Sequence, residues 1–209
     1  MPDKSEEVVI VGAVRTAIGT FNGSLKLIKA HQLGSMVISE VLKKSKFSGE
    51  EIDEVIMGQV LTSGSGQNPA RQAAISAGIS VSKPAFLVNQ VCGSGLRAVI
   101  LGYQSIRLGD VKNVISGGQE SMSLSPHSIL YRDKKKISEK ELVDTMINDG
   151  LIDAFNSYHM GVTAENVAKK FDISRQEQDQ FALNSQKKTQ EAIINKKFDE
   201  EIIKITRNG

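Results

Sequence analysis

Strand-like apolar runs alternate with helix-like segments through the first part of the chain. Four largely apolar runs have the length and composition of strands: 8–11, 54–60, 84–88 and 111–116. Helix-like segments separate them, since apolar residues recur at helical spacing over 33–41, Pro69 suits a first helical turn, and a third pattern begins at Leu96. This βαβαβαβ order predicts the α/β class, with a mainly parallel sheet covered by helices.

The character of the sequence changes after the last predicted strand. Strand-like runs disappear and charged residues become denser. Thr163 is predicted to cap one helix and Ser174 a second, because Glu177 stands at the capping-box position. We therefore expect an α/β domain over residues 1–121 and a mainly helical region over residues 122–209.

The composition excludes several classes of function. The net charge of +2 gives no strong attraction to nucleic acid or membranes, and the absence of Trp argues against a base-stacking surface. Residues 1–7 are unlike a signal peptide, and no apolar run could span a bilayer. A single cysteine forms no intrachain disulfide and fits a reducing compartment, so we expect a cytoplasmic protein. The basic cluster Arg132, Lys134, Lys135 and Lys136 is read equally well as a solvated loop or as an anion contact.

The one cysteine, Cys92, lies between a predicted strand and a predicted helix. A lone cysteine is most often a small buried hydrophobe, but a packed side chain does not need the flanking Gly93 and Gly95. These glycines allow a sharp turn and the close approach of another molecule. A helix start stabilises a thiolate through its exposed N–H groups and its dipole. The context therefore favours a reactive cysteine that ends a strand and opens a helix.

No residue near Cys92 in the sequence identifies itself as its base. His31 is interpreted as a surface or capping residue, His127 lies in a predicted loop, and His159 precedes a predicted helix. A hydrolase with a Cys-His pair is compatible with these residues but has no local signature. The glycine-rich stretch 58–66 lacks the spacing of a phosphate-binding loop and is interpreted as structural.

Five segments together resemble one family. The segment around Cys92 resembles the acylated-cysteine motif of the thiolases, the acetyl-CoA acetyltransferases. Four further segments match thiolase motifs in family order: 14–19, 67–72, 117–122 and 159–168. The resemblance implies a thiolase-like N-terminal half with an inserted loop domain, which residues 1–121 and 122–209 would form.

The resemblance also implies a chemistry. Cys92 would be acylated by an acyl-CoA and would pass the acyl group to CoA or to a second acetyl-CoA, with its own N–H in the oxyanion hole. Leu151, His159 and Met160 match positions that line the pantetheine and acyl tunnel, and the histidine is typical of enzymes for short chains. The family implies no metal and no cofactor beyond CoA thioesters as substrates, and it implies a homo-oligomer.

The chain also departs from the family pattern. Family members carry a second cysteine in a Cys-x-Gly motif, a Gly-His-Pro histidine and an Asn-Glu-Ala-Phe asparagine, and this sequence has none of these motifs. We therefore expect an N-terminal portion that lacks the C-terminal half and is inactive alone. One alternative is a ketoacyl synthase, which the 159–161 motif disfavours. The other is a non-catalytic remnant that only binds acyl-CoA or dimerises.

Overall fold

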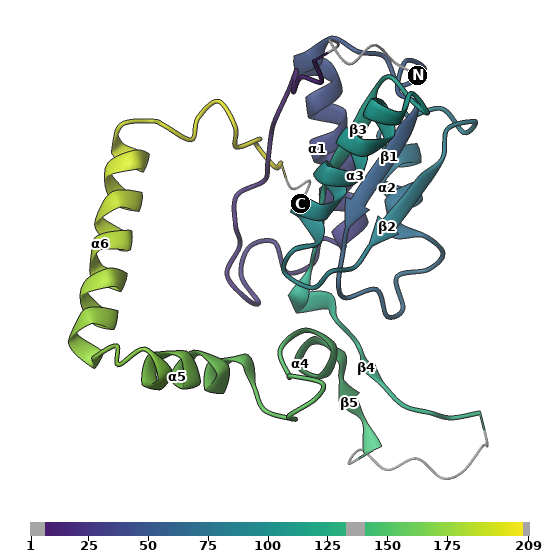
Figure 1. Ribbon diagram of the computed structural model, residues 1–209. Helices are drawn as coiled ribbons and strands as arrows, with labels where there is room; N and C mark the ends of the chain where they lie inside the picture. The colour runs from purple at the N-terminus through teal and green to yellow at the C-terminus, as the bar shows by residue number, and fades with distance from the viewer. Residues whose placement is uncertain (1–6, 133–140, 207–209) are drawn as a thin grey trace.

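A three-stranded parallel sheet forms the centre of the protein. The computed structural model describes residues 7–132 and 141–206. The strand order is β2-β1-β3, so β1 is central (Figure 1). Gly58 at the end of β1 pairs with Val88 of β2 and with Gly118 of β3, which brings the carboxyl ends of the strands to one edge. The strands are β1 (Glu54–Gly58), β2 (Ala85–Val88) and β3 (Val114–Gly118).

Helices cover both faces of this sheet, which confirms the predicted α/β class. Val55 and Met57 of β1 pack into an apolar core with α1 and α2. Gly58 points to the opposite face and contacts the start of α3, as the alternation of a strand requires. Pro69 is the first residue of α2, as expected. The three helices are α1 (Ala30–Ser45), α2 (Pro69–Ser76) and α3 (Ser94–Leu108).

Small residues let α3 lie unusually close to the sheet. Ser94, Ala98 and Gly102 recur every four residues and form the buried stripe of α3. A Cβ on Gly58 would stand 2.5 Å from the carbonyl carbon of Ser94, so only glycine fits at the end of β1. The start of α3 is thereby fixed against the carboxyl end of the central strand.

The large apolar residues of α3 lie on another face. Leu96, Val99, Ile100 and Tyr103 predicted the helix correctly, but their exposed fractions are 68%, 38%, 38% and 52%. The side chains that pack on the sheet are the small ones, which carry little periodic signal. An apolar stripe on α3 therefore stays open to solvent in this chain.

The predicted first strand at 8–11 is wrong. These residues form no strand, and Val9, Ile10 and Val11 are 64%, 81% and 63% exposed. The segment pairs with neither edge strand of the sheet, β2 or β3. The N-terminal segment instead passes α1, and its backbone hydrogen bonds run from Arg15 to the segment 201–203.

A side chain also shortens β3 at its start. The strand begins at Val114 rather than at Val111, because the carboxylate of Asp53 accepts the N–H groups of Lys112 at 2.9 Å and of Asn113 at 3.1 Å. These hydrogen bonds hold the pKa of Asp53 below its usual value. The chain therefore enters β3 through a side-chain clamp rather than through further strand pairing.

The region after β3 is mainly helical, as expected, with one addition. A short antiparallel pair, β4 (His127–Ser128) with β5 (Val143–Asp144), was not predicted. Ser174 and Glu177 form the predicted capping box, whereas Thr163 lies inside a helix that begins at Met160. The other elements are a 3₁₀ turn at Met122–Leu124 and the helices α4 (Thr145–Gly150), α5 (Met160–Lys170) and α6 (Arg175–Ile194).

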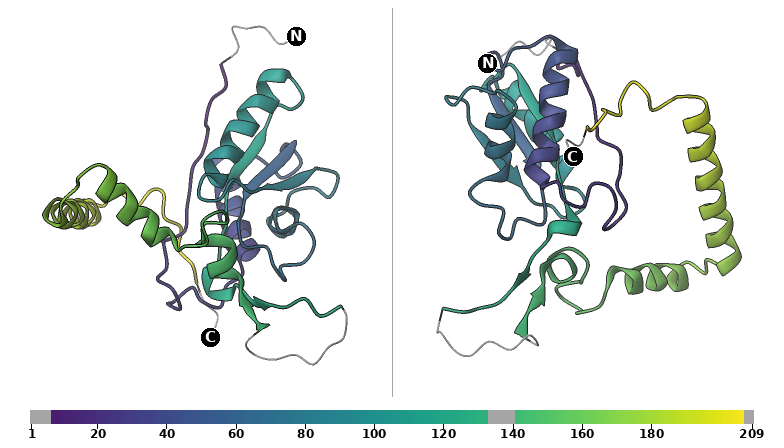
Figure 2. Two further views of the ribbon diagram at one scale, coloured as in Figure 1. Left: turned by 60° about the horizontal axis from the view of Figure 1, so that its bottom comes forward. Right: turned by 180° about the vertical axis from the view of Figure 1, so that it is seen from behind.

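Helices α5 and α6 stand away from the sheet and bury no residue (Figures 1 and 2). Within the described ranges, no helix combines the length and the apolar character needed to cross a lipid bilayer.

The contact between Gly58 and α3 predicts that a glycine-to-alanine substitution destabilises the protein in β1 but not in β3. Gly58→Ala places a methyl group against the backbone of Ser94 and should lower the free energy of unfolding by about 1–3 kcal/mol. Gly117→Ala in β3 is the matched control, because its Cβ would lie 3.9 Å from the nearest atom. Urea denaturation measures both variants, and equal stability of the two would contradict the close packing.

Candidate functional site

Cys92 is exposed in the turn that leads from β2 into α3. The prediction that it opens the helix needs a small correction, since α3 begins at Ser94 and Gly93 is its N-cap. Gly93 has no side chain to cap the first helical turn, and the N–H of Ser94 donates to the carbonyl of Val91 instead. The thiol therefore stands beside an uncapped helix start.

The residue before the cysteine has a strained backbone. Val91 has φ 50°, in the left-handed region that a β-branched residue avoids at a cost of about 1–2 kcal/mol. The side-chain Oδ1 of Asn89 accepts the N–H of Val91 at 2.9 Å and supports this conformation. Strain of this kind persists only where the surroundings enforce it, and it is common at functional sites.

Ser94 is the main clamp of the turn, and sequence reasoning missed it. Its side chain is buried. Its hydroxyl accepts the N–H of Gln90 at 2.8 Å and donates to the carbonyl of Val91 at 2.6 Å. The backbone N–H of Ser94 also donates to that carbonyl, at 3.1 Å. Because Ser94 packs on Gly58, this clamp ties the cysteine turn directly to the end of the central strand.

The backbone at Cys92 has an open donor. The N–H groups of Val91, Gly93 and Ser94 are all hydrogen bonded within the turn. In the part of the chain that the structure describes, no acceptor binds the N–H of Cys92. One residue thus offers an exposed thiol and a free N–H donor, an arrangement suited to nucleophilic attack on a carbonyl whose oxygen becomes negative.

None of the three histidines is bonded to the Cys92 thiol within the described residues. His31 lies inside the first turn of α1 and is not its cap, and burial together with nearby Lys29 lowers its pKa. His127 lies 4.0 Å from Asp144 across the β4–β5 pair. The Nδ1 atom of His159 accepts the N–H of Gly161 at 3.0 Å, so His159 caps α5.

The structure brings Leu151, His159 and Met160 together. A short hairpin connects α4 to α5, in which Met160 donates its N–H to the carbonyl of Leu151 at 2.8 Å and Ile152 pairs with His159. Leu151 is half-buried, while His159 and Met160 are exposed. Residues that are eight or nine positions apart in sequence therefore form one surface.

This hairpin starts beyond the carboxyl ends of the strands, the edge of the sheet at which Cys92 also lies. Gly150, the last residue of α4, is in van der Waals range of Leu61, which follows the carboxyl end of β1. Cys92 follows the carboxyl end of β2. In Figure 1, α4 lies beyond one end of the sheet. No hydrogen bond joins the hairpin to the cysteine turn in the described residues, and the link between the hairpin and the sheet is the contact of Gly150 with Leu61.

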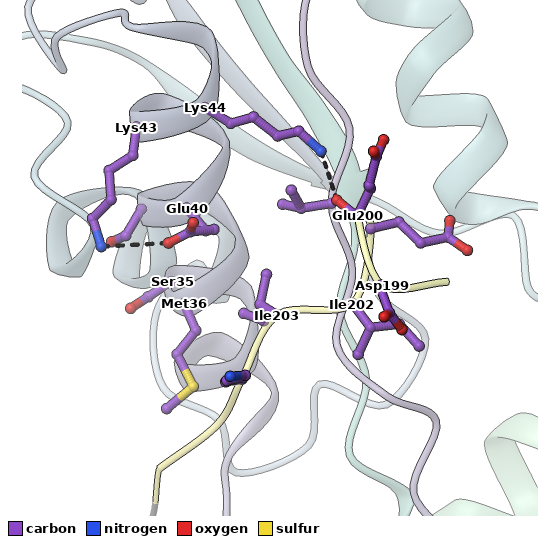
Figure 3. A pocket seen from close by; sticks show the side chains of 13 residues that line it. Ser35, Met36, Glu40, Lys43, Lys44, Asp199, Glu200, Ile202 and Ile203 are labelled. Atoms are coloured by element: carbon purple, nitrogen blue, oxygen red, sulfur yellow. Dashed lines mark hydrogen bonds and ion pairs between the residues drawn. The ribbon is translucent and has the colours of Figure 1, made fainter. Parts of the chain in front are cut away.

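A hollow elsewhere does not belong to this site. It lies between α1 and the segment 199–204, where Lys44 donates to the backbone carbonyl of Glu200 at 2.6 Å (Figure 3). Its lining includes neither Cys92 nor the hairpin. Within residues 7–132 and 141–206, no three His, Cys, Asp or Glu side chains gather as metal ligands.

The basic cluster stays largely untested. Arg132 is exposed, whereas Lys134, Lys135 and Lys136 lie outside the described residues.

Comparisons with known proteins agree on one family. Residues 8–209 match the model of the thiolase N-terminal domain. An acetyl-CoA acetyltransferase of Chromobacterium violaceum is 56% identical over 200 residues, which are 95% of this chain and 51% of the relative. The cytosolic acetyl-CoA acetyltransferase of Rattus norvegicus is 51% identical over 201 residues, which are 96% of this chain and 51% of the relative. The chain thus spans about half the length of the curated relatives it matches.

The strained backbone at Val91 predicts that a glycine at this position makes the protein more stable. Val91→Gly should raise the free energy of unfolding by about 1 kcal/mol, because glycine adopts the left-handed conformation freely and the valine side chain is half exposed. Val81→Gly is the control at an exposed valine without positive φ, and it should bring no gain. A loss of stability in Val91→Gly equal to that of the control would refute the strain at Val91.

Proposed function

The chain belongs to the thiolase family, and from this premise we propose that it supplies the nucleophile and part of the acyl-CoA site of an acetyl-CoA acetyltransferase. The observation that carries the proposal is the turn around Cys92, with an exposed thiol, a free N–H on the same residue and an uncapped helix behind it. The similarity to acetyl-CoA acetyltransferases from bacteria and a mammal supports the same chemistry.

The reaction proceeds through a thioester on Cys92. The Sγ atom attacks the carbonyl carbon of an acyl-CoA, and the N–H of Cys92 donates to the oxyanion that develops, which contributes a few kcal/mol in such sites. In condensation the acyl-CoA is acetyl-CoA: the bond to the CoA sulfur breaks, CoA leaves as a thiol after it takes up a proton, and the carbanion of a second acetyl-CoA takes the acetyl group from Cys92. In thiolysis the Sγ atom attacks the 3-keto carbon of a 3-ketoacyl-CoA: the bond between C2 and C3 breaks, acetyl-CoA leaves after C2 takes up a proton, and a CoA thiol then takes the acyl group from Cys92.

We assign the hairpin between α4 and α5 to substrate binding. Leu151, His159 and Met160 face the pantetheine arm and a short acyl chain, and the contact of Gly150 with Leu61 supports a position near the nucleophile. Residues 1–121 would then form the domain that carries Cys92, and residues 122–209 the acyl-CoA side.

The reaction also requires groups outside these 209 residues. Attack and transfer need one group that deprotonates a thiol and another that moves a proton at the α-carbon, and no histidine is bonded to Cys92 in the described part of the chain. The exposed apolar stripe of α3 offers a surface for further thiolase polypeptide, which would bring those groups. We propose that the functional form is a homo-oligomer of such complete units.

A second candidate is a protein that binds acyl-CoA or dimerises without catalysis. The absence of a base bonded to Cys92 in the described residues favours it for the isolated chain. The two candidates differ in one respect: only the enzyme depends on the thiol.

The first test removes the nucleophile. Purified chain is assayed for acetoacetyl-CoA cleavage with and without a polypeptide that carries the Gly-His-Pro and Cys-x-Gly motifs. We expect activity only with that polypeptide. Cys92→Ala should abolish it, and Cys92→Ser should nearly abolish it, because a hydroxyl ionises far less readily than a thiol. Normal turnover by Cys92→Ala would refute the proposal.

A second test concerns the acyl pocket. Met160 is 39% exposed, so Met160→Ala should change stability little and should instead raise KM or relax the preference for short acyl chains. Met57→Ala in the core is the control and should cost about 2–5 kcal/mol of stability without a selective kinetic effect. If Met160→Ala unfolds the protein as Met57→Ala does, Met160 is a packing residue.

A further inference from the structure

A polar cluster lies beneath the proposed site and takes no part in the proposed chemistry. Gln59 and Gln119 are 2% and 6% exposed, and Glu120 is partly buried. Gln59 and Gln119 directly follow the paired strand ends Gly58 and Gly118, so the register of the sheet places them side by side, and Glu120 comes next in the chain. Buried polar groups of this kind are expensive unless they are hydrogen bonded.

The Glu120 carboxylate binds the loop that follows β1. Its Oε2 atom accepts the N–H of Val60 at 2.8 Å and that of Leu61 at 3.3 Å, and Oε1 lies 3.4 Å from the latter. Burial raises the pKa of Glu120, and the hydrogen bonds from Val60, Leu61 and Ser121 oppose this shift. These bonds also explain why β1 ends at Gly58 rather than at the predicted Val60.

The two glutamines hold the same loop from the other side. Gln59 donates its side-chain N–H to the carbonyl of Leu61 at 2.8 Å, and Gln119 donates to the side-chain oxygen of Gln59 at 2.8 Å. Both polar backbone groups of Leu61 are therefore bound by side chains. The cluster therefore holds the loop at both its donor and its acceptor.

Leu61 connects the loop after β1 to the hairpin between α4 and α5. It is 8% exposed, and its Cδ2 atom lies 3.4 Å from the position that a Cβ on Gly150 would take. Gly150 ends α4, and the next residue, Leu151, accepts the N–H of Met160. A continuous set of contacts therefore runs from Glu120 to the hairpin.

We propose that Glu120 is a positioning residue for the acyl-CoA site, because its carboxylate fixes Leu61 and Leu61 fixes the end of α4 from which the hairpin at Leu151 starts. This inference rests on the proposed function, since it assigns the hairpin to acyl-CoA. Glu120 does not touch the substrate. It sets where the hairpin stands relative to Cys92.

The single cysteine provides a test that needs no turnover. Alkylation of Cys92 is followed by mass spectrometry with two reagents, bromoacetyl-CoA and bromoacetamide, and in each case the thiolate displaces bromide. In the unaltered chain, the rate with the CoA reagent should saturate with concentration, because the hairpin binds the pantetheine arm first. The rate with bromoacetamide should rise linearly.

Glu120→Gln keeps the shape of the side chain but removes its charge and one acceptor oxygen. It should raise the half-saturating concentration of bromoacetyl-CoA about tenfold, since small displacements of positioning groups have effects of at least this size. The bromoacetamide rate should not change. Leu61→Ala, which cuts the contact with Gly150, should act in the same direction. Glu177→Gln, the same exchange in the capping box of α6, should leave both rates unchanged.

Each other outcome has a separate meaning. Saturation in the unaltered chain with no effect of Glu120→Gln overturns the role of Glu120 alone. A variant that slows both reagents equally also overturns it, because Glu120 would then merely support the fold around Cys92. Absence of saturation in the unaltered chain overturns the proposed acyl-CoA site itself, and the positioning role falls with it.

Discussion

The close approach of α3 to the sheet is the constraint on which the rest of the structure depends. Glycine at position 58 lets the backbone of Ser94 and Gly95 lie directly on the end of β1. Ser94 can then bury its hydroxyl and clamp the turn that carries Cys92. A larger residue at Gly58 or at Ser94 would move the helix start away from the sheet, and the turn that carries Cys92 would lose its support.

The sequence predicted the helices better than the strands. Periodicity and caps identified α1, α2 and α6, because these signals are local. The run 8–11 has strand composition but forms no strand, since composition alone does not make a segment pair with a sheet edge. The limits of β1 and β3 are set by Glu120 and Asp53, whose partners are distant in sequence and invisible to local patterns.

The residues of the candidate site likewise differ in how far the sequence could identify them. Cys92 could be identified from its position between a strand and a Gly-rich helix start, and the resemblance to thiolases indicated the hairpin residues. Ser94 and Glu120 were missed, although both stand within segments that match the family. A serine at a helix start and a glutamate after a strand are common on surfaces, and only tertiary contacts distinguish these two.

The central claim is that Cys92 accepts an acyl group at the carboxyl edge of the sheet. The most direct measurement is mass-spectrometric mapping of the acetyl group after the chain, with the complementing thiolase polypeptide, is mixed with acetyl-CoA and quenched in acid. We expect one acetyl group on Cys92, released again when free CoA is added. Acetyl groups found only on lysine side chains, or none that CoA can remove, would contradict it.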